Sequence, residues 1–156
     1  MLQKDSLDDK DLAILRLLQA DGRISNADLA RNVQLSPPSV LQRVRRLDSQ
    51  GFVTNYTAVL DQEKMGFGLT VLDMVSLALH QEKPIDTFRS AVAKIPQVLE
   101  CHNISGEFDF VLKIAAADMR DYERLIREEL TAINGVGKIQ SCFVLGTSKQ
   151  TTNLPI

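Results

Sequence analysis

The spacing of apolar residues changes near residue 52, and this change predicts two domains of different construction. Before it, apolar residues recur at intervals of three and four, as in amphipathic helices. After it, segments of alternating apolar and polar residues lie between helical segments, as in mixed α and β structure. We therefore expect an α+β protein with one domain at 1–52, a β-strand and linker at 53–68, and a second domain at 69–156.

Three short helices are predicted in the first domain. Asp8 can cap the first helix, and Ser25 can cap the second. Ser36 and Pro37 suit the start of a third helix, which ends near Gly51. Because only a tight turn separates the last two helices, the pattern is that of a helix-turn-helix, and the β-prone residues that follow make it winged-helix-like.

The third helix carries a polar and basic face. A helical wheel places Val40, Val44 and Leu47 on one side, which we expect to face the core. Arginine can bind a guanine edge or a phosphate, glutamine can read adenine, and serine can contact either, so the opposite side suits double-stranded DNA. The candidate DNA-binding residues are Ser36, Pro38, Ser39, Gln42, Arg43, Arg45 and Arg46. The alternative is an ordinary solvated face on a helix that only packs.

The second domain has the order β-α-β-β-α-β, which is that of a ferredoxin-like fold. The alternation and the helical stripes predict strands at about 71–79, 98–105, 108–115 and 138–146, and helices at about 85–95 and 118–133. Gly106 and Glu107 mark a tight turn between the second and third strands. The expected order of strands in the sheet is 4-1-3-2.

Charge and composition narrow the classes of protein. The net charge of −2 argues against a chain coated with positive charge, although residues 1–60 carry +1 and residues 61–156 carry −3. Apolar runs are too short for a transmembrane helix, and the first residues lack the apolar stretch of a secretory signal. We therefore expect a cytoplasmic protein without a membrane partner.

The residues that carry most enzyme and metal chemistry are sparse. Cys101 and Cys142 fall on strands expected at opposite edges of the sheet, so we expect buried or interface thiols rather than a disulfide. His80 and His102 lack partners at metal-ligand spacing. Ferredoxin-like domains do include small enzymes, but no nucleophile–base pair or glycine-rich phosphate loop supports that alternative, and we expect no cofactor or metal.

Several spaced motifs resemble one family. In the first domain they are Leu7-Asp8, Asp21-Gly22-Arg23-Ile24-Ser25-Asn26, Leu35-Ser36-Pro37, Arg43-Val44-Arg45-Arg46-Leu47, Gly51-Phe52 and Tyr56-Thr57-Ala58. In the second they are Glu100-Cys101-His102, Ser105-Gly106-Glu107-Phe108-Asp109-Phe110 and Gly135-Val136. Across nearly its whole length the chain resembles the leucine-responsive regulatory protein/AsnC (Lrp/AsnC) family of bacterial and archaeal transcription regulators, and its leucine-responsive branch in particular.

The resemblance implies a helix-turn-helix domain and a ligand-binding domain of the predicted order. It implies dimers formed through the sheets, and often octamers. It also implies an amino acid, held between dimers, that changes assembly or DNA affinity, and a role in regulating genes of amino-acid metabolism on the nucleoid. Leucine or methionine is the expected effector. An architectural DNA-binding protein that needs no ligand shares all of these sequence features and stays open.

The turn around Gly106 is the expected effector site. Gly106 lets the chain turn and exposes N–H groups for a carboxylate, and Asp109 can pair with an ammonium group. From the residues alone, an ordinary hairpin turn in which Asp109 accepts backbone hydrogen bonds is the alternative. The resemblance places the effector here, with further contacts from a helix and from a neighbouring dimer. The expected residues are Asn103, Ile104, Ser105, Gly106, Asp109, Met119, Val136, Gly137 and Lys138.

Overall fold

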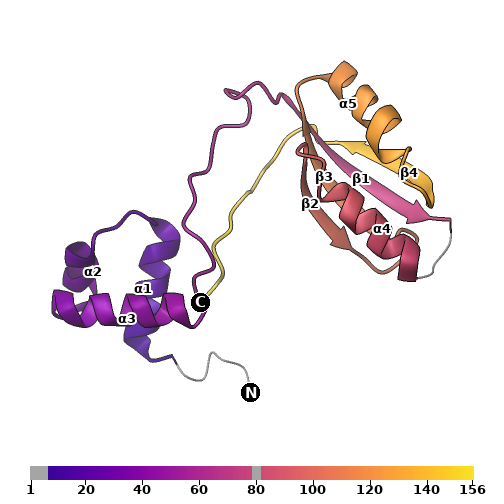
Figure 1. Cartoon of the computed structure of the whole chain (residues 1–156). Coiled ribbons are helices and arrows are strands. Elements are labelled where there is room, and N and C mark those ends of the chain that lie inside the picture. The colour runs from indigo at the N-terminus through magenta and orange to yellow at the C-terminus, as the bar shows by residue number, and fades with distance from the viewer. Residues whose placement is uncertain (1–6, 79–81) are drawn as a thin grey trace. The chain divides into compact units, whose positions relative to one another are not determined.

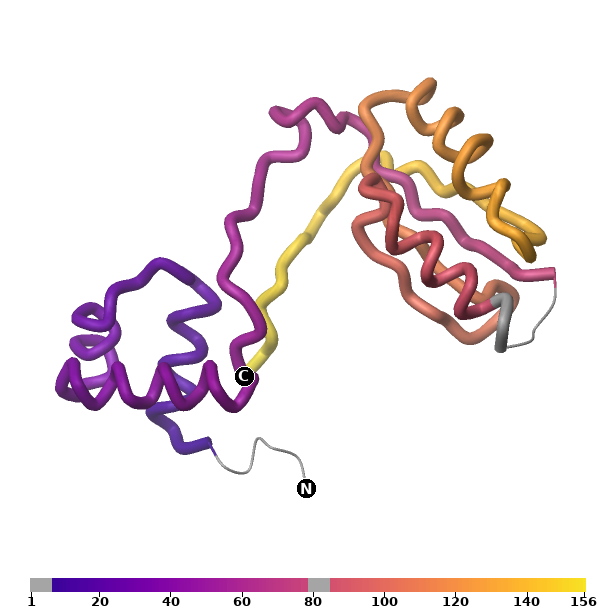
Figure 2. The backbone as a smooth tube through the Cα atoms, in the orientation of Figure 1, coloured from indigo at the N-terminus to yellow at the C-terminus, as the bar shows by residue number. Residues whose placement is uncertain are grey.

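The computed structural model describes residues 7–78 and 82–156, which form two compact units (Figure 1). The C-terminal unit comprises Leu60–Ser148, and the N-terminal unit comprises the chain up to Val59 together with Lys149–Ile156. The last eight residues were expected in the second domain, but they pack with the first. Figure 2 follows this path, in which the C-terminus ends at the helices of the N-terminal unit. The two units are therefore joined by two stretches of chain.

Three helices build the N-terminal unit: α1 (Asp9–Ala20), α2 (Asn26–Val33) and α3 (Pro37–Ser49). The predicted caps form, since Asp8, Ser25 and Ser36 each accept a hydrogen bond from the backbone N–H three residues later. Gln34 adopts a left-handed conformation with φ of 56° and makes the short turn between α2 and α3. The predicted helix-turn-helix is confirmed.

Apolar side chains from all three helices form the core of this unit. Ile14 of α1, Leu29 of α2, and Val40 and Leu47 of α3 are each at most 1% exposed. Within each helix the buried residues include pairs that lie three, four or seven positions apart, so each helix turns one face inward. This packing fixes which side of α3 faces solvent.

The predicted strand after α3 is wrong. In the structure, residues 51–53 form a turn and residues 54–60 form no helix or strand. Phe52 and Val53, two of the β-prone residues, pack instead against the helical core. A strand needs a hydrogen-bonded partner, and none of the strands among the described residues pairs with the segment, so β propensity alone did not decide its structure.

A four-stranded antiparallel sheet with helices forms the C-terminal unit. Its elements are β1 (Leu69–Leu77), α4 (Glu82–Val92), β2 (Val98–Asn103), β3 (Phe110–Ala116), α5 (Met119–Leu125), the π-helical turn η2 (Ile126–Leu130) that continues α5, and β4 (Val136–Phe143). The strand order β2-β3-β1-β4 confirms the predicted ferredoxin-like arrangement. The helix expected to run unbroken over 118–133 instead widens into η2, where the N–H of Thr131 bonds the carbonyl of Ile126 at 2.9 Å.

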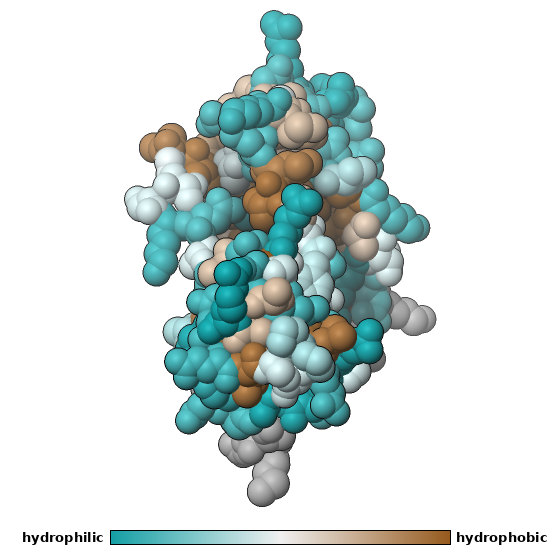
Figure 3. All heavy atoms as spheres, turned by 90° about the vertical axis from the view of Figure 1, so that its left-hand side faces the viewer, coloured by the Kyte–Doolittle hydropathy of each residue, from teal (hydrophilic) through white to brown (hydrophobic). Residues whose placement is uncertain are grey.

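The helices and one face of the sheet enclose the core of this unit. Phe88 of α4 stacks at 4.7 Å between ring centroids on Phe110 of β3, and Leu125 of α5 is 3% exposed. The other face of the sheet carries Leu72, which is 38% exposed, and the half-buried Met74. Figure 3 shows one side of the molecule, where the surface is mainly hydrophilic with separate hydrophobic patches.

A carboxyl group lies inside this core. Asp73, in the middle of β1, is 0% exposed, and the hydroxyl of Tyr122 on α5 donates to its Oδ1 at 2.7 Å. The same hydroxyl contacts Ser141 on β4, while Asp73 Oδ2 has no hydrogen-bond partner among the described residues. Burial raises the pKa of Asp73, and the hydroxyls of Tyr122 and Ser141 offset only part of this rise.

Candidate DNA-binding helix and effector turn

The outward face of α3 is polar, as the helical wheel predicts. Val40 and Leu47 are fully buried and Val44 is half-buried on the inner side. The candidate residues Ser36, Pro38, Gln42, Arg45 and Arg46 are exposed, while Ser39 and Arg43 are half-buried. The structure therefore brings all seven candidate residues to the surface of one helix and its N-terminus.

Two of the three arginines on this face are already paired. Arg43 Nη1 lies 2.7 Å from Asp8 Oδ2 and 2.8 Å from Asp11 Oδ1. Arg46 Nη2 lies 2.5 Å from Asp11 Oδ2. The hydrogen bonds from the N–H of Asp11 and from Arg43 hold the pKa of Asp8 below its ordinary value. The arginines do not form one equivalent group, because the carboxylates of α1 and its cap bind two of them.

Gln42 and Arg45 differ from these paired arginines. Within residues 7–78 and 82–156, the side chain of neither makes a hydrogen bond or an ion pair. Both are exposed and three positions apart, so they lie on the same face of α3. An amide and a guanidinium that are exposed and uncommitted are available to an outside partner.

The pairing of Asp11 with Arg43 and Arg46 was not predicted from the sequence. Only a helix cap, Asp8, was expected in this region. A signal was present in the spacing, because two acids three positions apart in one helix can meet two arginines three positions apart in another. Asp8 and Asp11 have this spacing at the start of α1, and Arg43 and Arg46 have it in α3. Finding the pairs needed the crossing of the two helices, which the sequence does not give.

The turn between β2 and β3 is held by backbone and side-chain hydrogen bonds. The Asp109 carbonyl accepts from the Ile104 N–H at 2.9 Å and from Asn103 Nδ2 at 2.8 Å. Gly106 has a φ of 128°, a backbone angle that residues other than glycine rarely adopt. A Cβ added at this position would meet no atom within 4 Å. The tip of the turn is therefore open, and Ser105 and Gly106 are exposed there.

Asp109 fastens this turn to the sheet. Its Oδ2 accepts from the Leu77 N–H at 2.7 Å, and its own N–H donates to the Val75 carbonyl at 2.9 Å. This is the role expected for Asp109 under the alternative hypothesis of an ordinary hairpin turn, in which its side chain accepts a backbone hydrogen bond. An ammonium partner would have to share a carboxylate that already holds the end of β1.

The start of β4 lies beside the turn in the same chain. Lys138 Nζ is 3.1 Å from Glu107 Oε1 and 4.9 Å from the centre of the Phe108 ring. This follows from the topology, because β1 lies between β3 and β4 and its C-terminal end meets the beginning of both. Val136 and Lys138, expected to reach the effector from a neighbouring dimer, thus lie at the turn of their own subunit.

Gly137 has a structural reason to be glycine. A Cβ at this position would lie 3.2 Å from the backbone of Ser76 and of Ala78, where β4 approaches the end of β1. Met119 is different from the other effector candidates. It begins α5, directly after β3, whereas the turn directly precedes β3, so one chain does not bring Met119 to the turn. Met119 is 46% exposed at its own end of the sheet.

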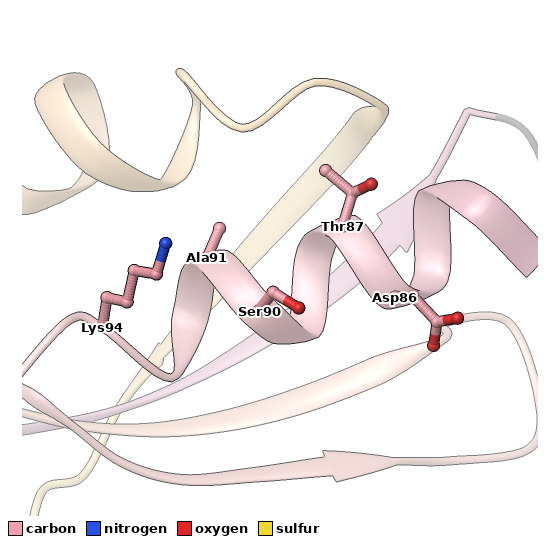
Figure 4. A pocket seen from close by; sticks show the side chains of 5 residues that line it. All are labelled: Asp86, Thr87, Ser90, Ala91 and Lys94. Atoms are coloured by element: carbon pink, nitrogen blue, oxygen red, sulfur yellow. The ribbon is translucent and has the colours of Figure 1, made fainter.

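A hollow of about 450 Å³ lies along α4 (Figure 4). It is lined by Asp86, Thr87, Ser90, Ala91 and Lys94, all on or just after this one helix. None of the predicted effector residues lines it. Residues along a single helix do not surround a small molecule, so we do not assign the effector to this hollow.

The remaining candidate groups are two cysteines and two histidines. Cys101 and Cys142 lie on the predicted edge strands, and both are exposed free thiols. Burial within one chain, the first of the two expectations, is therefore wrong, and their place at an interface stays a prediction. His102 contacts Glu100 at 3.1 Å, and His80 lies outside the described residues. Among the described residues, no group of three or more acids, cysteines or histidines could hold a metal ion. None of the helices described is both long and apolar enough to cross a membrane.

Two family models match the chain. The model described as winged helix-turn-helix DNA-binding matches residues 7–54, and the model described as Lrp/AsnC ligand binding domain matches residues 70–154. The leucine-responsive regulatory protein of Klebsiella pneumoniae is 41% identical over 96% of this chain and 92% of its own. The transcriptional regulator AzlB of Bacillus subtilis is 35% identical, with 96% of each chain covered.

Solved structures agree with the sequence comparison. The structure of the transcriptional regulator NMB0573 from Neisseria meningitidis, in complex with L-Met, has a TM-score of 0.93 and 36% identity, covering 96% of this chain and 97% of that chain. The AsnC family regulator from Agrobacterium tumefaciens has a TM-score of 0.90 and 30% identity, with coverage of 96% and 97%. These relatives are transcription regulators.

Proposed function

The chain belongs to the Lrp/AsnC family of transcription regulators, and on this premise we propose that it binds specific sites on double-stranded DNA through α3. The outward face of this helix supports the proposal most strongly. Its amide and guanidinium groups at Gln42 and Arg45 are exposed and uncommitted, and they are the groups that read adenine and guanine edges. Ser36 and Ser39 stand at the N-terminus, where a phosphate binds well.

An amino acid is the proposed effector, with leucine or methionine as first candidates. The L-Met bound to the Neisseria regulator and the names of the leucine-responsive relatives support this choice. We place its carboxylate at the open tip around Gly106 and its ammonium group near Asp109. Asn103, Ile104, Ser105, Val136, Gly137 and Lys138 are the neighbouring candidates of the same chain, and Met119 is offered by another subunit.

Assembly completes the proposal. One helix-turn-helix reads few base pairs, so a homodimer with two half-sites is the smallest useful unit. The uncovered sheet face with Leu72 and Met74 supports pairing of sheets, and dimers then assemble into octamers. The regulator acts in the cytoplasm, on the nucleoid, at genes of amino-acid metabolism.

A ligand screen tests the effector. Each of the common amino acids is added to the full chain, and the melting temperature, the mass by sedimentation and the affinity for a selected DNA site are measured together. Leucine or methionine should raise the melting temperature and change the mass or the affinity. A screen in which no amino acid changes any of the three quantities would favour the ligand-free architectural role instead, which the occupied Asp109 carboxylate also suits.

Asp109→Asn then tests the ammonium contact. The Asn side-chain oxygen can still accept from the Leu77 N–H, so the turn should hold while the negative charge is lost. Calorimetry should show at least tenfold weaker effector binding with unchanged DNA affinity in the absence of effector. Full-strength effector binding by this variant would remove Asp109 from the site.

Arg45→Ala combined with Arg46→Ala tests the DNA surface. The oligomer should keep its mass and lose affinity for the selected site, whereas Arg120→Ala, at an exposed position of α5, should bind normally. Wild-type affinity of the double variant in a gel-shift assay would show that α3 is not the recognition helix.

A further inference from the structure

A buried acid lies beneath the DNA-binding face. The side chain of Asp11 is 1% exposed, although it stands in the first turn of α1, close to the surface candidates of α3. A buried carboxylate is costly unless it is paired and hydrogen-bonded. Asp11 meets this requirement through Arg43 at 2.8 Å and Arg46 at 2.5 Å, each on a different carboxylate oxygen.

These contacts change what α3 can offer to DNA. Arg43 is also held by Asp8 at 2.7 Å, and its side chain is only 27% exposed. Among the described residues, Arg46 is held by Asp11 alone, and its side chain is 43% exposed. Two carboxylates thus stand against two guanidinium groups, and their charges balance. Arg45 is the cation of α3 that no described carboxylate neutralises.

We propose that Asp11 is a positioning residue of the DNA-binding surface. It holds Arg43 and Arg46 in fixed orientations against α1 and competes with DNA phosphates for both. Sequence-independent attraction is thereby kept low, and Arg45 with Gln42 provides most of the new contacts. This inference rests on the proposed DNA binding through α3.

This proposal can be tested through salt, because a protein cation that binds a DNA phosphate releases a counterion and makes the affinity depend on salt concentration. Each phosphate neutralised by a protein cation contributes a slope of about −0.9 to the logarithm of affinity against the logarithm of salt concentration. A guanidinium already neutralised by a carboxylate brings little net charge to a phosphate. Arg43 and Arg46 should therefore each contribute clearly less than 0.9 to the magnitude of the salt slope, while Arg45 should contribute the full value of about 0.9.

Asp11→Asn tests the role, with Asp8→Asn as a matched control that removes the same charge from a half-exposed position holding Arg43 alone. Affinities of the full chain for a selected site and for random DNA are measured by fluorescence anisotropy at several salt concentrations. Asp11→Asn should steepen the slope by about 0.9 per bound subunit, so the loss of affinity between 50 and 200 mM salt should be about 3.5-fold larger per subunit. It should also raise affinity for random DNA and lower the ratio of specific to random binding, and Asp8→Asn should do so less.

A role in folding alone predicts another result. Loss of helix packing would weaken both affinities in proportion to the unfolded fraction and leave the salt slope unchanged, which would overturn the positioning role. Circular dichroism on both variants measures that fraction. If the wild-type chain binds no DNA site at all, the proposed function fails before the role of Asp11 is reached.

A second pair of variants keeps the test decisive if Asp11→Asn does not fold. Arg45→Gln should reduce the salt slope by about 0.9 per subunit, and Arg46→Gln should reduce it by clearly less. Equal reductions would show that Asp11 does not withhold Arg46 from DNA, and the inference would be wrong.

Discussion

The buried network at Asp73 gives a prediction whose size follows from its contacts. Tyr122→Phe removes one hydroxyl group and leaves the ring, which is 4% exposed and packs edge-on at 5.4 Å against Phe143. Asp73 Oδ1 then loses the 2.7 Å hydrogen bond from that hydroxyl, and Oδ2 already lacks a partner among the described residues. The variant therefore removes the 2.7 Å donor of a fully buried carboxyl group.

The cost can be bounded from these contacts. A buried acceptor left unsatisfied costs about 1–3 kcal/mol, so we expect the free energy of unfolding to fall by about 2 kcal/mol. A domain of this size loses roughly 4–8 °C of melting temperature per kcal/mol, which corresponds to a drop of about 8–16 °C. Loss of volume contributes little, because phenylalanine fills nearly the same space.

The cost should also depend on pH, in a direction set by Asp73. Because burial raises its pKa, the folded chain favours the protonated acid. The stability that the protonated Asp73 contributes is fully present below the pKa of Asp73 in the unfolded chain, about 3.9. It is lost as the pH rises through the pKa of Asp73 in the folded chain. The Tyr122 hydroxyl lowers the pKa of Asp73, so its removal raises that pKa further, and the cost of Tyr122→Phe should grow as the pH rises through the pKa of Asp73 in the folded chain.

Urea unfolding at several pH values, read by circular dichroism, is the assay. The control is the same substitution in an Asp73→Val background, where no buried acceptor remains to be left unsatisfied. There Tyr122→Phe should be nearly neutral, since replacing both partners by apolar groups removes the unsatisfied group. An equal cost in both backgrounds, or a cost independent of pH, would show that the cost does not come from the buried carboxyl group of Asp73.

Three further substitutions test other parts of the fold. Leu47→Ala, at a fully buried position of α3, should cost about 2–5 kcal/mol and abolish DNA binding, while sedimentation shows the oligomer unchanged. Gly106→Val should cost about 1–3 kcal/mol in thermal melts because of the φ of 128°, although space is open; an unchanged melting temperature would exclude strain at the turn. Gln19→Ala removes the 2.6 Å bond to the Leu154 N–H, costs about 1 kcal/mol, and should speed proteolysis of residues 149–156, in contrast to the exposed Gln140→Ala.

The elements of both domains were predictable because local patterns specify them. Capping residues such as Ser36 and the spacing of Val40, Val44 and Leu47 placed α3 and its inner face within a residue or two. The order of strands followed from the order of elements along the chain. The strand expected within 53–68 does not form, because pairing depends on a partner strand that local sequence does not identify.

The placement of the candidate residues in the fold was predictable, and their interactions were less so. The face of α3 and the turn around Gly106 lie where the sequence placed them. The pairing of Asp11 with Arg46 and the contact of Lys138 with Glu107 join residues more than thirty positions apart. Such contacts depend on how helices and strands pack, which periodicity within one element does not encode. Met119, suggested by resemblance alone, lies at the other end of the sheet because β3 separates it from the turn.

Cross-linking identifies the surface of the chain that contacts DNA. Gln42 and, separately, Arg120 are replaced by a photoreactive residue in the full chain, and each variant is irradiated with a labelled DNA site selected by the wild-type protein. The residue at position 42, on the outward face of α3, should form the covalent adduct, and the residue at 120, on α5, should not. An adduct at 120 with none at 42, from oligomers of wild-type mass and affinity, would show that α3 does not contact DNA.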